Sequence, residues 1–125
     1  MPVEPGLSAR GSLVVLDTDT ALALRSGDVP VLATPRLIAL CEEAACLAVD
    51  GVLGEDRTSV GVRVQFDHLA PVSSGSEVVA EATLEKVEGR RLVFTVTATD
   101  AAGLVGAGKV TRVVVERGDF LAKAR

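Results

Sequence analysis

The chain has 125 residues, with 13 lysines and arginines against 17 aspartates and glutamates, for a formal net charge of −4. A chain of this length buries one hydrophobic core, so we expect a single domain over residues 1–125. The acidic balance offers no basic surface for nucleic acid, and no apolar run approaches the ~20 residues that span a membrane. The amino terminus lacks the basic and apolar regions of a signal peptide, which favours a cytoplasmic location.

Two short segments and a long helix are predicted first. Residues 12–17 form a short apolar run that predicts a strand, and residues 20–24 are a second, weaker strand prediction. A helix follows over residues 34–51. Thr34 is a good N-cap, Pro35 suits the first helical position, and Gly51 is a natural stop. Apolar residues lie nearly all round this helix, which is typical of a mostly buried helix.

Four strands are predicted after the helix, over residues 59–69, 76–87, 91–99 and 104–117. In the second and third, apolar and polar side chains alternate, so one face of each strand points inward. Glu88-Gly89-Arg90 predicts a hairpin turn between them. One apolar helix followed by antiparallel strands indicates an α+β fold, with the helix wrapped by a curved sheet. Unpaired sheet edges favour a homodimer in which two chains form one continuous sheet.

The helix carries two adjacent carboxylates in different surroundings. Glu43 shares a face with Arg36 and Asp50 and is expected to reach solvent, whereas Glu42 projects from an apolar stripe. A buried carboxylate is costly unless it is hydrogen-bonded or paired. Glu42 therefore either has a partner or lies at the edge of the stripe and reaches water.

The two cysteines, Cys41 and Cys46, lie on the same helix but do not share a face. With one distant histidine they make a poor zinc site. We therefore predict two small buried thiols and no metal site.

His68 is the only histidine and ends the strand-like run over residues 60–68. With regular alternation it points inward, on the same face as the apolar residues at positions 60, 62, 64 and 66, and Gly61 points to the other face. Histidine takes up or releases a proton near neutral pH. An inward histidine at a strand end is either a hydrogen-bonded core residue or a catalytic base.

An ordered set of motifs, from about residue 18 to residue 120, resembles the hot-dog fold thioesterases of the fluoroacetyl-CoA thioesterase family. The motifs are Ala33-Thr34, Leu40-Cys-Glu-Glu-Ala-Ala-Cys46, Ser59-Val60-Gly61, His68-Leu69-Ala70-Pro71, Val87-Glu88-Gly89-Arg90-Arg91-Leu92 and Gly106-Ala107-Gly108-Lys109-Val110-Thr111-Arg112. The resemblance implies a hot-dog fold and hydrolysis of a small or medium acyl-CoA thioester, without a cofactor. It implies that Thr34, Glu42 and His68 form the catalytic set. It further implies that the backbone of Gly61 contacts the thioester and that Arg112 lies near the acyl-CoA.

These residue types suit thioester hydrolysis, which requires a nucleophile, a proton acceptor and donors for the carbonyl oxygen. Thr34 offers a hydroxyl at a helix start, where free N–H groups favour negative charge, although a threonine before proline is often only a cap. His68 is suited to taking a proton from Thr34 or from water and returning it to the departing thiol, and Glu42 to orienting the imidazole or stabilising its charged form. Thr34 and Glu42 are separated by about 12 Å of helix rise, so the histidine or the substrate must bridge them.

One departure from the family concerns the acyl group. Members that select fluoroacetyl-CoA carry phenylalanines in the loop before the catalytic threonine, but residues 20–33 contain none here; Arg25, Asp28 and Val31 stand there. We therefore expect little preference for fluoroacetyl over acetyl.

Two other classes of function remain open from the sequence. A non-catalytic acyl-CoA-binding module would keep the cleft and turn over nothing. A hot-dog hydratase acting on enoyl thioesters would use an Asp/His pair, whereas Asp67 and His68 are adjacent and point to opposite faces of the strand.

Overall fold

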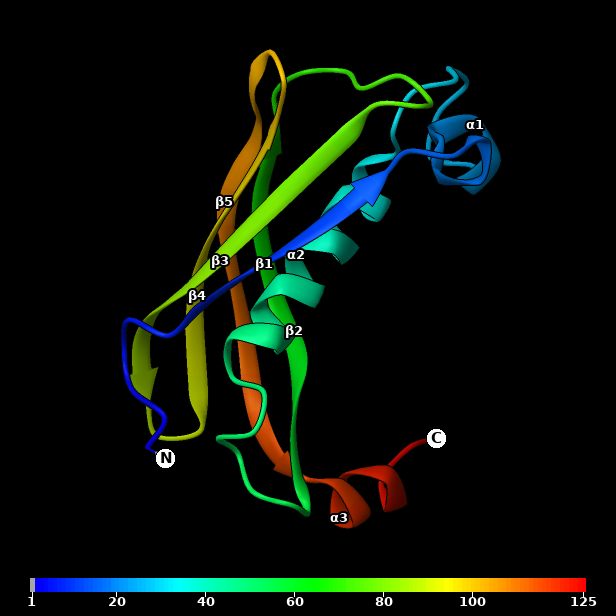
Figure 1. Cartoon of the computed structure of the whole chain (residues 1–125). Helices are drawn as coiled ribbons and strands as arrows, with labels where there is room; N and C mark the ends of the chain where they lie inside the picture. The colour runs from blue at the N-terminus through cyan, green and yellow to red at the C-terminus, as the bar shows by residue number, and fades with distance from the viewer. Residues whose placement is uncertain (1) are drawn as a thin grey trace.

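The computed structural model describes residues 2–125 and has the α+β architecture predicted from the sequence (Figure 1). One five-stranded antiparallel sheet, in the order β1-β3-β4-β5-β2, curves around the long helix α2. The strands are β1 (Ser8–Val14), β2 (Arg57–His68), β3 (Glu77–Glu88), β4 (Arg91–Asp100) and β5 (Gly103–Glu116). The remaining elements are the 3-10 turn η1 (Asp17–Asp19) and the helices α1 (Ala21–Leu24), α2 (Thr34–Ala48) and α3 (Arg117–Ala122).

The core lies between α2 and the concave face of the sheet. The alternation in β3 and β4 is confirmed: the predicted inward residues are all buried, namely Val78, Ala80, Ala82 and Leu84 in β3, and Leu92, Phe94, Val96 and Ala98 in β4. The predicted turn between these strands is also present, and Gly89 adopts a φ of 61° there, which glycine tolerates without steric cost.

Small residues on the sheet allow the helix to pack closely. Ala80, Ala82 and Ala98 present only methyl groups to the core, and a side chain built on Gly11 would already be in van der Waals contact with Leu40 of α2, at 3.5 Å from its Cδ1 atom. Because protein cores are filled to near-crystalline density, alanine and glycine here set a short distance between helix and sheet.

The predictions at the amino terminus are partly wrong. The first strand, β1, begins at Ser8 rather than residue 12 and ends at Val14. The segment over residues 20–24, predicted as a strand, is mostly the short helix α1, because the Thr20 side chain caps it by accepting a hydrogen bond from the Ala23 N–H at 3.2 Å. A capping hydroxyl accepts a hydrogen bond from a backbone N–H group of the helix, which in a strand would pair with a neighbouring strand instead.

The carboxyl terminus contains a helix that was not predicted. The sequence extended the last strand to residue 117, whereas β5 ends at Glu116 and α3 follows directly. This helix buries none of its residues, and with six residues it is too short for a helical period to be recognised in the sequence. Within residues 2–125, no helix is long and apolar enough to cross a membrane.

Strand β2 forms one edge of the sheet and pairs only with β5 in the order of strands. Its register with β5 shifts between Gly61 and Arg63, so Val62 is the extra residue of a β-bulge. Val62 and Val64 are 51% and 38% exposed. An edge strand with exposed valines and unpaired backbone groups is a ready template for pairing with another chain.

Helix α2 is less uniformly buried than its composition suggested. Its buried residues are Leu37, Leu40, Cys41, Ala44, Ala45 and Ala48. Cys46 is exposed, so the prediction of two buried thiols is correct for Cys41 and wrong for Cys46. Burial in the core, and next the negative charge of Glu42, raise the pKa of Cys41 to about 11. Both effects disfavour the thiolate, which is the reactive form of cysteine.

This shift predicts an inert thiol at position 41. In a Cys46→Ser variant, we expect iodoacetamide at about pH 8 to leave the folded protein unmodified, because Cys41 is both inaccessible and protonated well below its raised pKa. In denaturant the same variant should take up one label. Intact-mass spectrometry counts the labels, and rapid labelling in native buffer would contradict the burial of Cys41.

Candidate active site

Thr34 and His68 meet in direct contact. The Oγ1 atom of Thr34 lies 2.8 Å from Nδ1 of His68, a hydrogen-bond distance across two elements far apart in the sequence. The N-cap of α2 is Ala33, not Thr34 as predicted, and it has no side-chain cap bond. The Thr34 hydroxyl is therefore directed to the histidine and does not serve as a helix cap.

The position of His68 depends on the end of β2. It pairs with Gly106 of β5, and a side chain built on Gly106 would collide with the ring of Phe66. The glycine thus leaves room for Phe66 to lie across β5 beside the histidine. The Nε2 atom of His68 is buried and has no hydrogen-bond partner within residues 2–125. A buried polar atom without a partner is uncommon in folded proteins, and a catalytic role is one of its recognised causes.

A cavity of about 350 Å³ opens beside the Thr34–His68 pair. Its walls come from α1, the loop that follows α1, the start of α2 and the segment after β2. The lining residues are Ala21, Ser26, Gly27, Asp28, Val29, Val31, Leu32, Thr34, His68, Leu69, Ala70 and Pro71. Most of these side chains are small or apolar, and the convergence of two polar groups on such a cavity is typical of a small-molecule site.

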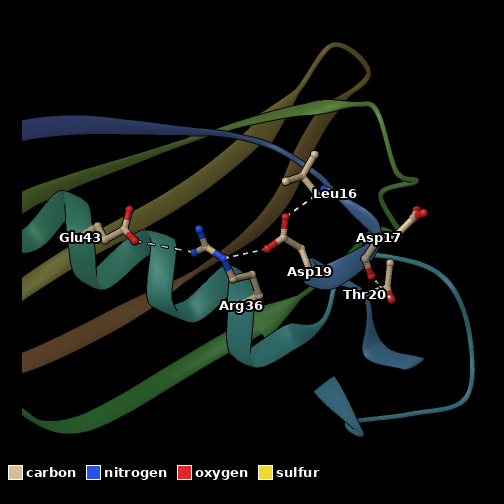
Figure 2. A network of polar contacts seen from close by, with 6 residues as sticks. All are labelled: Leu16, Asp17, Asp19, Thr20, Arg36 and Glu43. Atoms are coloured by element: carbon tan, nitrogen blue, oxygen red, sulfur yellow. Dashed lines mark hydrogen bonds and ion pairs between the residues drawn. The ribbon is translucent and has the colours of Figure 1, made fainter. Parts of the chain in front are cut away.

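The loop over residues 20–33 is held at both ends. Isolated β-bridges join Thr20 to Leu32 and Val31 to Ser73. Figure 2 shows a network at its base, in which Asp19 accepts hydrogen bonds from Arg36 Nε at 3.2 Å and from the Leu16 N–H at 2.8 Å. The cavity wall is thereby tied to the first turns of α2.

The Asp19–Arg36 contact was not found from the sequence. Its two partners are 17 residues apart and lie in separate elements. Asp19 is only 13% exposed at its side chain, and no spacing rule within one helix or strand connects it with Arg36. Figure 2 also shows Arg36 reaching toward Glu43, at 3.8 Å, on the solvent side of α2.

Glu42 has a partner, which was one of the two alternatives that its place on the apolar stripe left open. Its Oε2 atom lies 3.1 Å from Nη1 of Arg112 on β5. Arg112 is 7% exposed, and its other nitrogens donate to the Oγ and the main-chain oxygen of Ser59, each at 2.9 Å. Ser59 begins one of the motifs, but the sequence assigned it no role, because a serine at the start of a strand is unremarkable without its partner.

Gly61 belongs to this same cluster. A Cβ atom built on Gly61 would lie 2.6 Å from Oε2 of Glu42 and 3.4 Å from Nη1 of Arg112. Any side chain at this position would therefore displace the carboxylate. The structure brings together Glu42, Gly61 and Arg112, three of the five site residues that the resemblance implied.

The bulge at Val62 corrects the predicted faces of β2. Regular alternation placed Val60 and Val62 with His68, and Gly61 on the opposite face. In the structure, Gly61 pairs with Arg112 and His68 pairs with Gly106, which share one face of β5, so Gly61 and His68 both face α2. The extra residue of the bulge reverses the alternation between them.

Within one chain the five residues form two clusters. Thr34 and His68 lie at the start of α2, whereas Glu42, Gly61 and Arg112 lie about 12 Å further along the helix axis. The hydrogen-bond partner of Glu42 is Arg112, and no bond joins Glu42 to His68 in the described part of the chain. The expectation that Glu42 orients the imidazole is therefore not met inside a single chain.

A metal centre is not apparent in the described structure. Between residues 2 and 125, no group of three or more His, Cys, Asp or Glu side chains is placed to hold an ion. The side chains of Thr34, His68, Glu42 and Arg112 supply a hydroxyl, an imidazole, a carboxylate and a guanidinium.

Comparison with known proteins gives a consistent result. Residues 15–118 match the family model of the fluoroacetyl-CoA-specific thioesterase. The fluoroacetyl-CoA thioesterase of Streptantibioticus cattleyicolor is 35% identical over 95 residues, which cover 76% of this chain and 68% of that protein. A solved structure of a fluoroacetyl-CoA thioesterase superposes with a TM-score of 0.92 at 29% identity, covering 98% of this chain and 96% of the other.

Two further solved structures share the fold. A Thermus thermophilus protein described as a thioesterase superfamily member has a TM-score of 0.88 at 30% identity, covering 97% of this chain and 90% of that one. A hot-dog-like protein from Thermanaerovibrio acidaminovorans has a TM-score of 0.86 at 33% identity, covering 95% and 87%. The chain therefore belongs to the fluoroacetyl-CoA-specific thioesterase family and is a thioesterase with the hot-dog fold.

Proposed function

We propose that this chain hydrolyses a small or medium acyl-CoA thioester to the acid and free coenzyme A, at the cavity beside Thr34 and His68. The observation that carries the proposal is the 2.8 Å contact between Thr34 Oγ1 and His68 Nδ1 at the edge of that cavity. A hydroxyl bonded to an imidazole is the arrangement of an activated nucleophile. A related thioesterase variant has been solved in complex with fluoroacetate and CoA, which supports coenzyme A as the carrier.

The two side chains divide the chemistry between them. His68 Nδ1 accepts the proton of Thr34 as Oγ1 attacks the thioester carbonyl carbon, and the imidazolium returns this proton to the departing thiol. Water then hydrolyses the acyl-threonine ester, with His68 again acting as the base. Thr34 is the first residue of α2, so the free N–H groups and the dipole of the helix start favour the negative charge that develops on the carbonyl oxygen.

Glu42 joins this site, in our proposal, from a second copy of the chain. The β2 edge is unpaired, and its valines are exposed. If two β2 strands pair antiparallel about a two-fold axis between Val64 and Gln65, Gly61 of the partner subunit comes beside His68, and Glu42 of the partner subunit comes with it. The same arrangement brings this carboxylate to the helix-facing side of the joined sheet, where His68 also lies.

The acyl pocket carries no aromatic lid in our proposal. None of the residues lining the cavity is a phenylalanine, and Asp28, Val29 and Val31 stand in its wall. Such a wall accepts small and medium aliphatic groups and lacks the phenylalanines expected of a fluoroacetyl-selective member. The free cysteines and an acyl-CoA substrate also agree with a reducing, cytoplasmic location.

A panel of acyl-CoA substrates with free-thiol detection tests this function directly. We expect thiol release from at least one acyl-CoA of small or medium length, with rates for fluoroacetyl-CoA and acetyl-CoA of the same order of magnitude. The common carrier makes acetyl-CoA the matched control. A fluoroacetyl preference above a few hundred-fold would show that another part of the pocket selects fluorine. Binding of every member without thiol release would indicate a binding module, and hydration of an enoyl-CoA would indicate a hydratase.

Substitutions at the catalytic set should separate chemistry from stability. His68→Ala is expected to lower kcat about 10²–10⁴-fold, the usual contribution of a positioned base. Thr34→Ser should retain more turnover than Thr34→Val, because only the serine keeps the hydroxyl. Glu42→Gln should lower turnover while the protein stays folded. If these variants change only the melting temperature while thiol release continues at the wild-type rate, the residues are structural.

Mixed dimers test whether the site is shared between chains. Neither Thr34→Val nor Glu42→Gln homodimers should turn over normally. A heterodimer of the two variants places both changes in one site and leaves the other site intact, so activity should return to about half of the wild-type value. If all five residues acted within one chain, the heterodimer would stay as slow as its parents. Sedimentation at micromolar concentration should show a dimer or larger, and a clean monomer would contradict the pairing.

A further inference from the structure

We propose that Ser59 is a positioning residue for the thioesterase reaction: it fixes the guanidinium of Arg112, and Arg112 in turn holds one oxygen of Glu42 in place above Gly61. This inference rests on the proposed function, because Ser59 acts on the reaction only through Glu42. It assigns a role to Ser59, which stands in the motif Ser59-Val60-Gly61 without an implied role and does not line the cavity beside His68.

Two atoms of Ser59 determine the orientation of the arginine. Nε of Arg112 donates to Oγ of Ser59, and Nη2 donates to the main-chain oxygen of the same residue, both at 2.9 Å. A guanidinium is planar, with its donors in a fixed fork. Two contacts to one residue therefore fix both the plane and the direction of the group, and the third nitrogen, Nη1, is left pointing at Glu42.

Because Arg112 and Ser59 are buried, a change in the orientation of the guanidinium is energetically costly. Arg112 is 7% exposed and Ser59 is 8% exposed. A buried charge is costly unless its donors are satisfied, and within residues 2–125 the carboxylate that pairs with Arg112 is Glu42. Without the serine hydroxyl, Nε of Arg112 loses its acceptor at a position that is poorly accessible to water. We then expect the guanidinium to rotate away from Glu42.

Gly61 limits the carboxylate from the other side. Its missing side chain leaves just enough room for Oε2 of Glu42, since a Cβ atom there would come within 2.6 Å. Oε2 is thus held between Arg112 and the backbone of Gly61. The second oxygen, Oε1, makes no hydrogen bond to the described residues, and the side chain of Glu42 is 34% exposed. One oxygen is anchored and the other is available to the reaction.

The chain offers a rescue variant and a matched control. Ser59→Ala removes the hydroxyl, whereas Ser59→Thr keeps it, and Ser59 borders a cavity of about 490 Å³. Thr58→Val removes a hydroxyl one residue earlier on β2, where the side chain faces the other side of the sheet and makes no hydrogen bond among residues 2–125.

The test measures kcat and KM with the best acyl-CoA of the panel. The proteins compared are the wild type, these three variants, Glu42→Gln and the double variant Ser59→Ala/Glu42→Gln. We expect Ser59→Ala to lower kcat about tenfold, the scale of losing a hydrogen bond to a charged group, with KM changed less than about threefold. Ser59→Thr should recover most of kcat, and Thr58→Val should match the wild type. The double variant should be no slower than Glu42→Gln alone, because both changes remove the same contribution.

The outcomes separate this inference from the proposed function. If Glu42→Gln lowers kcat but Ser59→Ala does not, or if the two losses multiply in the double variant, the positioning role is overturned while the thioesterase site stands. If the wild type releases no thiol from any acyl-CoA, the proposed function itself fails. Should Ser59→Ala fold poorly, Ser59→Cys under reducing conditions keeps a side chain of the same shape with a somewhat larger terminal atom and weakens the acceptor, and wild-type kcat in that variant overturns the role.

Discussion

The close packing of α2 against a sheet face of small residues determines where the site residues lie. Alanines of β3 and β4 and a glycine of β1 bring the helix near the sheet, and little freedom remains for it to slide or rotate in a densely packed core. Figure 1 shows α2 lying along the concave face, with β2 beside it. Helix α2 thereby places Thr34 and Glu42 at two positions along its axis. Strand β2 places His68 beside the first of them and Gly61 beside the second.

Thr34 illustrates how local and functional requirements compete for one side chain. A threonine before a proline at a helix start usually caps the helix, and an unfilled cap costs about 1 kcal/mol. Here the cap position falls on Ala33, which has no capping atom, and the hydroxyl is used for His68 instead. Departures from local rules are expected at functional sites, and this one lies beside the cavity.

Much of the fold follows from patterns that are local in sequence. The alternation in β3 and β4, the glycine turn between them and the start of α2 were predicted because each depends on residues within a few positions of one another. The errors have equally local causes. A threonine cap turned residues 20–24 into a helix, and α3, with six residues, is too short for a helical period to be recognised. Val62 fits the regular alternation with Val60 and Val64, so the pattern gives no sign that it is the extra residue of a bulge.

The candidate site was only partly accessible from sequence for a related reason. Its five residues followed from ordered motifs, but their grouping depends on contacts between residues tens of positions apart. Ser59 and Arg112 are 53 residues apart, and only the pairing of β2 with β5 brings them together. Polar contacts of this kind need the register of the sheet, which one sequence does not contain.

The bulge in β2 has a consequence for how such chains can vary in length. Gly61 and His68 are separated by an odd number of positions, and in a regular strand they would point to opposite sides of the sheet. The single extra residue at Val62 brings both to the helix side. A chain with one residue fewer in this stretch and no bulge would give the same placement. The site therefore requires that the number of residues between Gly61 and His68 match the presence or absence of a bulge, and it places no such requirement on the identity of those residues. An insertion or deletion of one residue there is compatible with the site only when a bulge is gained or lost with it.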